Sequence, residues 1–167
     1  MNAGFSKLAE LAPQLAELSV SDMYKQMGMT MMSTIGGSSG VLYGSAYIAA
    51  AKVTVDIDTI DVHSLFPVLE AMLQAIMDRG RSKPGFKTMI DALYPAVEEY
   101  RTALKAGVPE TELLQRVKKA AEDGAENTKN MEAVRGRACY QSDKGIGHLD
   151  PGAVTMAYQI EELTDFI

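Results

Sequence analysis

The sequence predicts an all-α protein, an up-and-down antiparallel bundle or barrel of helices. Apolar residues recur at spacings of three and four along most of the chain, and the joints between these segments are short and marked by glycine or proline. Only residues 53–57 alternate as a strand does, and so short and isolated a segment is interpreted as an extended connector. Helices joined by short loops pack as antiparallel neighbours. We therefore predict a single helical domain over residues 1–167.

The first two helices are predicted from their apolar periodicity and their capping residues. Apolar side chains over residues 5–18 predict a helix with a kink or break near Pro13, because proline removes a helical N–H and clashes with the preceding turn. Ser19 or Ser21 is expected to cap a second helix that runs to Ile35. The glycine- and serine-rich segment 36–40 separates this helix from the next.

The later helices follow the same pattern. They are expected over residues 42–51, 61–80, 88–104 and 109–132, and from residue 151 onward. Asp61 or Ser64 is expected to begin the helix that ends at Gly80. In the last helix Asp150 is expected at the N-cap and Pro151 at the first helical position. A polar, glycine-rich loop over residues 135–149 precedes it.

Composition excludes several function classes. The net charge of −6 and the pI of about 4.9 argue against nonspecific nucleic-acid binding, which depends on Lys and Arg neutralising phosphates. No apolar run approaches the roughly 20 residues that a membrane span needs, so no membrane partner is expected. The absence of a secretion leader and the single Cys139 favour a cytoplasmic protein.

The segment Gly36–Gly40 is the first candidate for ligand binding. Glycine allows a ligand to approach the backbone closely, and the start of the following helix presents N–H groups and a positive dipole end to a phosphate. Ser38 and Ser39 add hydroxyl donors. The alternative is a tight turn between helices with a serine N-cap. The segment is not a Walker A motif, because no Lys-Ser or Lys-Thr pair follows it.

The second candidate joins residues 136–140 to residues 145–152. Arg137 can pair with a phosphate through two N–H groups, and His148 can donate to one. Asp150 can cap its helix or accept a hydrogen bond from a ligand. The alternative is a flexible turn in which Asp150 is only a cap.

The third candidate is the segment of residues 79–89, which carries four basic residues in an acidic protein. Such a loop can lie against a nucleotide. Alternatively, Arg79 and Lys83 are cations near a helix C-terminus, where the helix dipole favours positive charge. Two histidines and one cysteine form no zinc pattern.

These segments, in this order, resemble the ADP-binding L subunit (DhaL) of bacterial dihydroxyacetone kinases and the matching C-terminal nucleotide-binding domain of single-chain dihydroxyacetone kinases. The matching segments are residues 2–5, residues 36–44, Arg79–Gly80 with residues 87–93, and residues 136–138 with 147–153. The resemblance covers nearly the whole chain. Each segment alone is weakly specific, whereas their common order and spacing are strongly specific.

The resemblance implies a barrel of antiparallel helices that binds ADP or ATP with Mg²⁺ at one rim. The nucleotide-binding residues that it implies are Gly37, Ser38, Ser39, Gly80, Met89, Arg137, Asp150, Pro151 and Gly152. It implies neither a catalytic side chain nor a metal ligand within this chain. We expect the three loops that carry these residues to meet at the same end of the ring of helices and to hold a diphosphate.

The sequence departs from the family pattern in three places. The family has three metal-binding aspartates, ending in an Asp-His-Gly turn, directly before the segment that matches residues 1–5, and this sequence starts after them. Without them, tight binding of Mg-ADP and catalysis are expected to be lost. Phe86 replaces an acidic residue, and residues 141–145 differ from the family's loop. Truncation and divergence of a paralogue both explain these departures. Loss of the family's first helix predicts exposed apolar surface, and hence homodimerisation or poor solubility.

The leading hypothesis is a phosphotransferase subunit of a dihydroxyacetone (glycerone) kinase. By resemblance, its partners are a subunit that holds dihydroxyacetone and a phosphohistidine carrier subunit that recharges bound ADP to ATP. The alternative is a catalytically inactive paralogue that acts as a partner-binding or regulatory helical module, so enzyme activity of this chain stays open.

Overall fold

The computed structural model describes residues 2–167 and, for Asn2, the backbone alone. The chain divides into two compact units between Arg81 and Ser82. The first unit holds α1 (Asn2–Leu15), α2 (Val20–Thr34), α3 (Gly37–Val53) and α4 (Val62–Gly80), and the second holds α5 (Ile90–Ala106), α6 (Glu110–Asn127) and α7 (Pro151–Phe166) with the short 3₁₀ helices η1 (Thr128–Asn130) and η2 (Arg137–Tyr140). No strand occurs among the described residues, so the all-α prediction is confirmed. The single domain over 1–167 stays a prediction, and Met1 lies outside the described residues.

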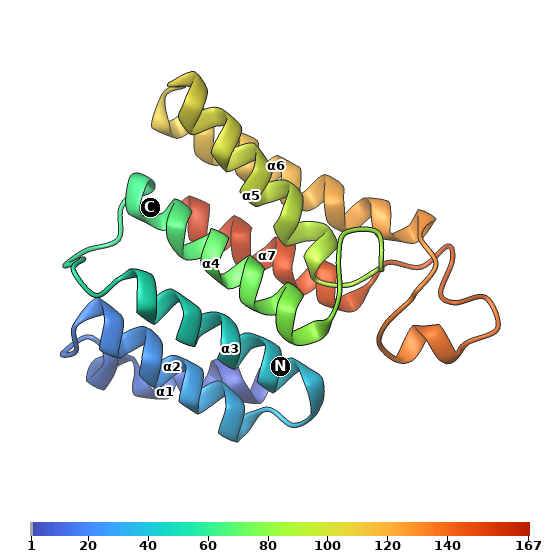
Figure 1. Cartoon of the computed structure of the whole chain (residues 1–167), viewed down its shortest axis with the longest axis horizontal. Coiled ribbons are helices and arrows are strands. Elements are labelled where there is room, and N and C mark those ends of the chain that lie inside the picture. The colour runs from blue at the N-terminus through green and yellow to red at the C-terminus, as the bar shows by residue number, and fades with distance from the viewer. Residues whose placement is uncertain (1) are drawn as a thin grey trace. The chain divides into compact units, whose positions relative to one another are not determined.

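The first unit is an up-and-down arrangement in which α2 packs against both α1 and α3, and α3 packs against α4 (Figure 1). The Ser19 hydroxyl accepts a hydrogen bond from the Asp22 N–H at 3.1 Å and begins α2, as predicted. Asp61 and Ser64 form a reciprocal capping box at the start of α4, with bonds of 2.7 and 2.8 Å. Both residues proposed for this start therefore take part in it.

The core of the first unit lies between its packed helices. Tyr43, Ala46 and Ala50 of α3 are fully buried, as are Leu65, Val68 and Ile76 of α4. Tyr24 of α2 stacks on Tyr47 of α3 with ring centroids 6.2 Å apart. Residues 54–61 connect α3 to α4, and no strand forms there, as predicted. The predicted bounds and extended conformation were wrong, because Val53 belongs to α3 and residues 55 and 56 form a turn.

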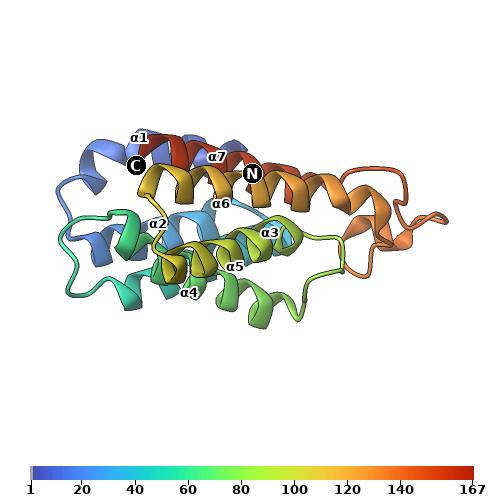
Figure 2. The ribbon, with the colours of Figure 1, turned by 90° about the horizontal axis from the view of Figure 1, so that it is seen from above.

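The second unit is a three-helix arrangement in which α5, α6 and α7 pack against one another. Leu93, Val97 and Tyr100 of α5 meet Leu113 and Val117 of α6 and Ile160 of α7 in the core. Near the C-terminal end of α7, Lys118 of α6 pairs with Glu161 and Asp165, each at 2.9 Å. The loop over residues 131–149 extends beyond the end of α6 and returns to the start of α7 (Figure 2).

Several predicted boundaries were wrong. The third helix begins at Gly37, so most of the glycine-serine joint belongs to its first turn. The sixth helix ends at Asn127 rather than near residue 132. The reason is Thr128, whose hydroxyl donates to the Ala125 carbonyl at 2.6 Å and accepts the Asp150 N–H at 2.9 Å. These bonds redirect the chain, and η1 follows. Within the described part of the chain, no helix is long and apolar enough to cross a bilayer.

Candidate functional site

The start of α3 is a tight turn that leaves its first amide groups without a side-chain cap. Gly37 has a φ of +74°, a conformation that glycine adopts without steric cost. A Cβ on Gly40 would lie 2.0 Å from the Ile35 carbonyl oxygen, so only glycine fits there. The N-cap is Gly36, and it makes no side-chain hydrogen bond. The alternative of a serine N-cap is therefore wrong, and the first turn offers N–H groups to an anion.

Replacing Gly40 by alanine is expected to destabilise the protein by about 2 kcal/mol, because the added methyl meets fixed backbone. Gly36→Ala is the matched control, since a Cβ there meets nothing within 4 Å and surface changes usually stay within about 0.5 kcal/mol. Urea unfolding measures both. Equal stability of the two variants would show that the turn is not constrained.

Gly80 lies at the same end of the α3–α4 pair as Ser38 and Ser39. The two helices are consecutive, packed together and joined by a short connector, so the end of α4 lies beside the start of α3 (Figure 1). Arg81, with a φ of +46°, ends α4 in the left-handed conformation, and its N–H reaches the carbonyls of the last turn. The four predicted residues of the first unit, Gly37, Ser38, Ser39 and Gly80, thus lie at one end of it.

In the second unit the start of α5 is shaped by a buried carboxylate. One oxygen of Asp91 accepts the Gly85 N–H at 2.6 Å, and the other accepts the Thr88 N–H at 2.7 Å. The Thr88 hydroxyl in turn accepts the Ile90 N–H at 3.2 Å. This arrangement satisfies orphan amides before and within the first turn of the helix. It fixes the backbone that carries Met89, which is itself buried.

Lys87 is buried in the same segment, with 2% of its surface exposed. Its Nζ donates to the carbonyl oxygens of Thr128 and His148, both at 2.6 Å. The preceding carbonyl, that of Phe86, accepts the Val134 N–H at 3.2 Å. The segment before α5 is therefore bound to the segment between α6 and α7. By contrast, Lys83 is an exposed cation that lies over the Phe86 ring, 5.5 Å from its centroid.

The start of α7 lies directly against Met89. Asp150 caps the helix by accepting the Ala153 N–H at 2.7 Å, and Pro151 occupies the first helical position, both as predicted. A Cβ on Gly152 would lie 3.5 Å from Met89 N and 3.7 Å from Met89 Cβ. The second unit therefore brings together four of the predicted residues: Met89, Asp150, Pro151 and Gly152.

Burial raises the pKa of the Asp150 carboxyl above its usual range, and the charge of Asp91 adds to this effect. The hydrogen bond from Ala153 and the charge of Lys87 oppose it. A raised folded-state pKa means that the folded protein holds this proton more tightly than the unfolded chain. The stability that results is fully present below the unfolded pKa and is lost as pH rises through the folded pKa.

The variant Asp150→Asn keeps an oxygen for the Ala153 N–H but does not ionise. Its stability relative to the native protein is therefore expected to increase between about pH 4, near the unfolded pKa of an aspartate, and pH 7. Asp61→Asn is a control of opposite sign, because hydrogen bonds from Ser64 lower the pKa of Asp61. Urea unfolding at both pH values checks the two signs. An Asp150→Asn difference that falls with pH would contradict this account.

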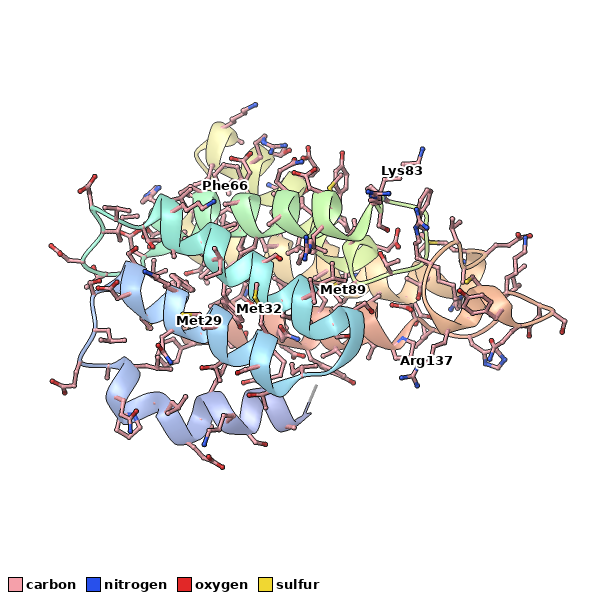
Figure 3. The ribbon with its side chains drawn as sticks, turned by 60° about the horizontal axis from the view of Figure 1, so that its bottom comes forward. Met29, Met32, Phe66, Lys83, Met89 and Arg137 are labelled. Carbon is pink, nitrogen blue, oxygen red and sulfur yellow. The ribbon has the colours of Figure 1, made fainter. Side chains whose placement is uncertain are left out.

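Arg137 begins η2 in the loop between α6 and α7. Its side chain is exposed and extends outward from the loop, so the guanidinium is available to a ligand (Figure 3). Backbone hydrogen bonds brace the loop, from Gly147 N–H to Lys129 O at 2.8 Å and from Ala133 N–H to Lys144 O at 2.9 Å. Asp150 caps α7, as the alternative of a flexible turn also requires, so a ligand-binding role for this loop stays a prediction. A guanidinium on a braced loop suits two-point binding of a phosphate.

The Mg²⁺ that the resemblance implies stays a prediction, and no metal ligand is predicted within this chain. A Mg²⁺ site needs carboxylate and other oxygen ligands. Among the described residues, no group of three or more His, Cys, Asp or Glu side chains is placed to hold a metal ion.

Lys87, Asp91 and Thr128 organise the second unit's part of the site through their hydrogen bonds, although none of them is among the predicted nucleotide-binding residues. A usable signal was present for one of them. Thr88 and Asp91 are three residues apart, the spacing of a capping box before an apolar run. No such local pattern marks Lys87, whose partners are 41 and 61 residues away.

The comparisons with known proteins agree with the all-helical fold. The family model described as the DAK2 domain matches residues 1–165. The chain is 34% identical over 163 residues to the "PEP-dependent dihydroxyacetone kinase, ADP-binding subunit DhaL" of Escherichia coli (strain K12), covering 98% of this chain and 78% of that protein. It is 40% identical over 157 residues to the "PEP-dependent dihydroxyacetone kinase 1, ADP-binding subunit DhaL" of Listeria innocua, covering 94% of this chain and 73% of that protein.

A solved structure shares the fold. The crystal structure of the dihydroxyacetone kinase of C. freundii in its native form matches with a TM-score of 0.70 and 27% identity. The match covers 99% of this chain but only 28% of the kinase chain. Taken with the helical fold, the family model and these two relatives define the class of protein. The chain belongs to the DAK2 domain family.

Proposed function

We propose that this chain is an ADP-binding subunit of a dihydroxyacetone kinase. The observation that carries the proposal is its similarity, over nearly its whole length, to proteins named as ADP-binding subunits of that enzyme. The local structure gives support of a different kind. The first turn of α3 is uncapped and Arg137 is exposed on a braced loop, and both features suit a diphosphate.

Two sets of residues are proposed to contribute to ADP binding. In the first unit, the amides and hydroxyls of Gly37, Ser38 and Ser39 would take phosphate oxygens, with Gly80 at the same end of the helix pair. In the second unit the proposed residues are Met89, Arg137, Asp150, Pro151 and Gly152. The buried Met89 would line the nucleotide pocket, whereas Arg137 offers paired N–H groups to a phosphate.

The proposed reaction passes the γ-phosphoryl group of ATP to dihydroxyacetone held on a partner subunit. A bond forms between a dihydroxyacetone hydroxyl oxygen and the γ-phosphorus, the bond to the β–γ bridging oxygen breaks, and ADP stays on this chain. A phosphohistidine carrier subunit would recharge that ADP. The role of this chain would be to bind and orient the nucleotide. We propose a cytoplasmic location. The proposed homodimer is a separate expectation that does not depend on this role.

Ligand-dependent unfolding tests the nucleotide part of this proposal. Because ADP would bind only the folded state, its addition is expected to raise the thermal midpoint progressively. At an ADP concentration 100 times the dissociation constant, the free energy of unfolding should increase by about 2.7 kcal/mol. AMP and inorganic phosphate at the same concentrations are the controls and should have smaller effects. An unchanged midpoint at millimolar ADP would refute nucleotide binding.

Reconstitution tests the transfer step. The chain is mixed with the dihydroxyacetone-binding subunit and the phosphorylated carrier, and dihydroxyacetone phosphate is measured. Product that forms only when all three proteins are present would support the proposed partners. Binding of ADP without any transfer would instead favour the catalytically inactive, partner-binding alternative.

A further inference from the structure

The buried Lys87 is a costly residue that the proposed nucleotide contacts do not include. Burying a charged group costs free energy unless hydrogen bonds replace its hydration. Its ammonium is held by two backbone carbonyl oxygens, those of Thr128 and His148. Its backbone also has a φ of +59°, a left-handed conformation that a residue with a side chain rarely adopts. Backbone strain of this kind persists where the surroundings require it, and it often marks functional regions.

The two carbonyls lie at the two ends of the loop between α6 and α7. Thr128 directly follows α6, whereas His148 comes two residues before the Asp150 cap of α7. One ammonium therefore binds both ends of the loop that carries Arg137, from a position two residues before Met89. The C-terminal part of the loop also lies close to this side chain, since a Cβ on Gly145 would lie 3.2 Å from Lys87 Cε.

We infer that Lys87 is a positioning residue that fixes Arg137 and Asp150 relative to Met89 by binding both ends of the intervening loop. It would not touch the nucleotide itself. The inference rests on the proposed function only for its effect on ADP affinity. Its effect on the order of the loop follows from the hydrogen bonds alone.

Lys144 offers a matched control for substitution of Lys87. It also has a left-handed backbone, with a φ of +48°, and it lies in the same loop. Its side chain is exposed and forms an ion pair with Glu132 at 2.8 Å. Lys87→Met and Lys144→Met therefore share the loss of a lysine charge at a strained backbone position. They differ in whether the lost ammonium was buried on the two carbonyls.

The test is hydrogen–deuterium exchange of the full chain, read at the amides of Ala133, Val134 and Gly147. These donate to the carbonyls of Lys144, Phe86 and Lys129, respectively. In Lys87→Met their exchange is expected to be at least about tenfold faster, while residues 112–126 of α6 keep their rates. Lys144→Met should change the loop rates by less than about threefold. Unchanged loop rates in Lys87→Met would overturn the inference. So would an equal increase throughout α6, because that would indicate a loss of global stability only.

ADP affinity gives a second readout, and a fall of about tenfold is expected in Lys87→Met but not in Lys144→Met. If the native protein binds no ADP, the proposed function fails, whereas the exchange data still decide the role of Lys87. If Lys87→Met does not fold, amine acetylation of the native protein decides instead. Lys87 should be labelled far more slowly than Lys144, and labelling at equal rates would exclude the buried contact.

Discussion

Asp91→Ala is expected to destabilise the protein by about 3–4 kcal/mol, the largest effect predicted here, because a buried carboxylate accepts two backbone amides. Alanine leaves the N–H groups of Gly85 and Thr88 without this acceptor. The segment that they shape contains Lys87 and leads into Met89. We therefore expect ADP affinity to fall together with stability.

A graded series separates the hydrogen bonds from the packing of Asp91. Asp91→Asn keeps one acceptor oxygen of similar size, so it should lose about half as much stability as Asp91→Ala. Urea unfolding gives the free energies, and calorimetry gives the ADP affinities. If Asp91→Ala were as stable as the native protein, the carboxylate would not hold the start of α5.

Gly124→Ala is expected to have the second largest effect, a loss of about 3 kcal/mol, because a Cβ there would meet the backbone of the neighbouring helix. The added carbon would lie 2.1 Å from the Asp91 carbonyl oxygen and 2.8 Å from a ring carbon of Pro95. Helix α6 would have to move away from the start of α5. The substitution should thus disturb the same segment as Asp91→Ala without removing a hydrogen-bonding side chain.

The neighbouring Asp123 supplies the control for Gly124. Its side chain is 64% exposed and pairs with Lys119 on the surface of α6, and a pair of this kind contributes little. Asp123→Ala is therefore expected to change stability by less than about 0.5 kcal/mol. Thermal unfolding monitored by circular dichroism compares the two variants. Similar midpoints would mean that α6 can shift at no cost.

The fold class was predictable because helix formation depends mainly on residues that are close together in the sequence. Apolar spacing and capping residues depend on neighbours three and four positions away, so Ser19, Asp61 and Asp150 could be recognised as caps. The end of α6 was not predictable in this way. It depends on the bond between Thr128 and Asp150, which are 22 residues apart.

The candidate site was predictable in its composition but not in its internal support. Glycine, serine and arginine at helix starts and in loops are recognisable as possible phosphate-binding residues. The individual residues were then assigned from the resemblance of the segments to the family. The role of Lys87 depends on two distant carbonyls, and a lysine in a basic loop is typical of a solvated surface. Lys87 becomes buried only when the loop between α6 and α7 folds over it, so its burial could not be predicted from its neighbours in the sequence.

Calorimetric titration of ADP into the native chain, into Arg137→Ala and into the double variant Ser38→Ala/Ser39→Ala tests the central proposal most directly. The native chain should bind one ADP, and each variant should bind at least about tenfold more weakly, a loss of roughly 1.4 kcal/mol. Lys129→Ala, a loss of an exposed side chain from η1, should bind like the native chain. Absence of binding by the native chain, or equal affinity in all four proteins, would contradict the assignment of these residues to ADP.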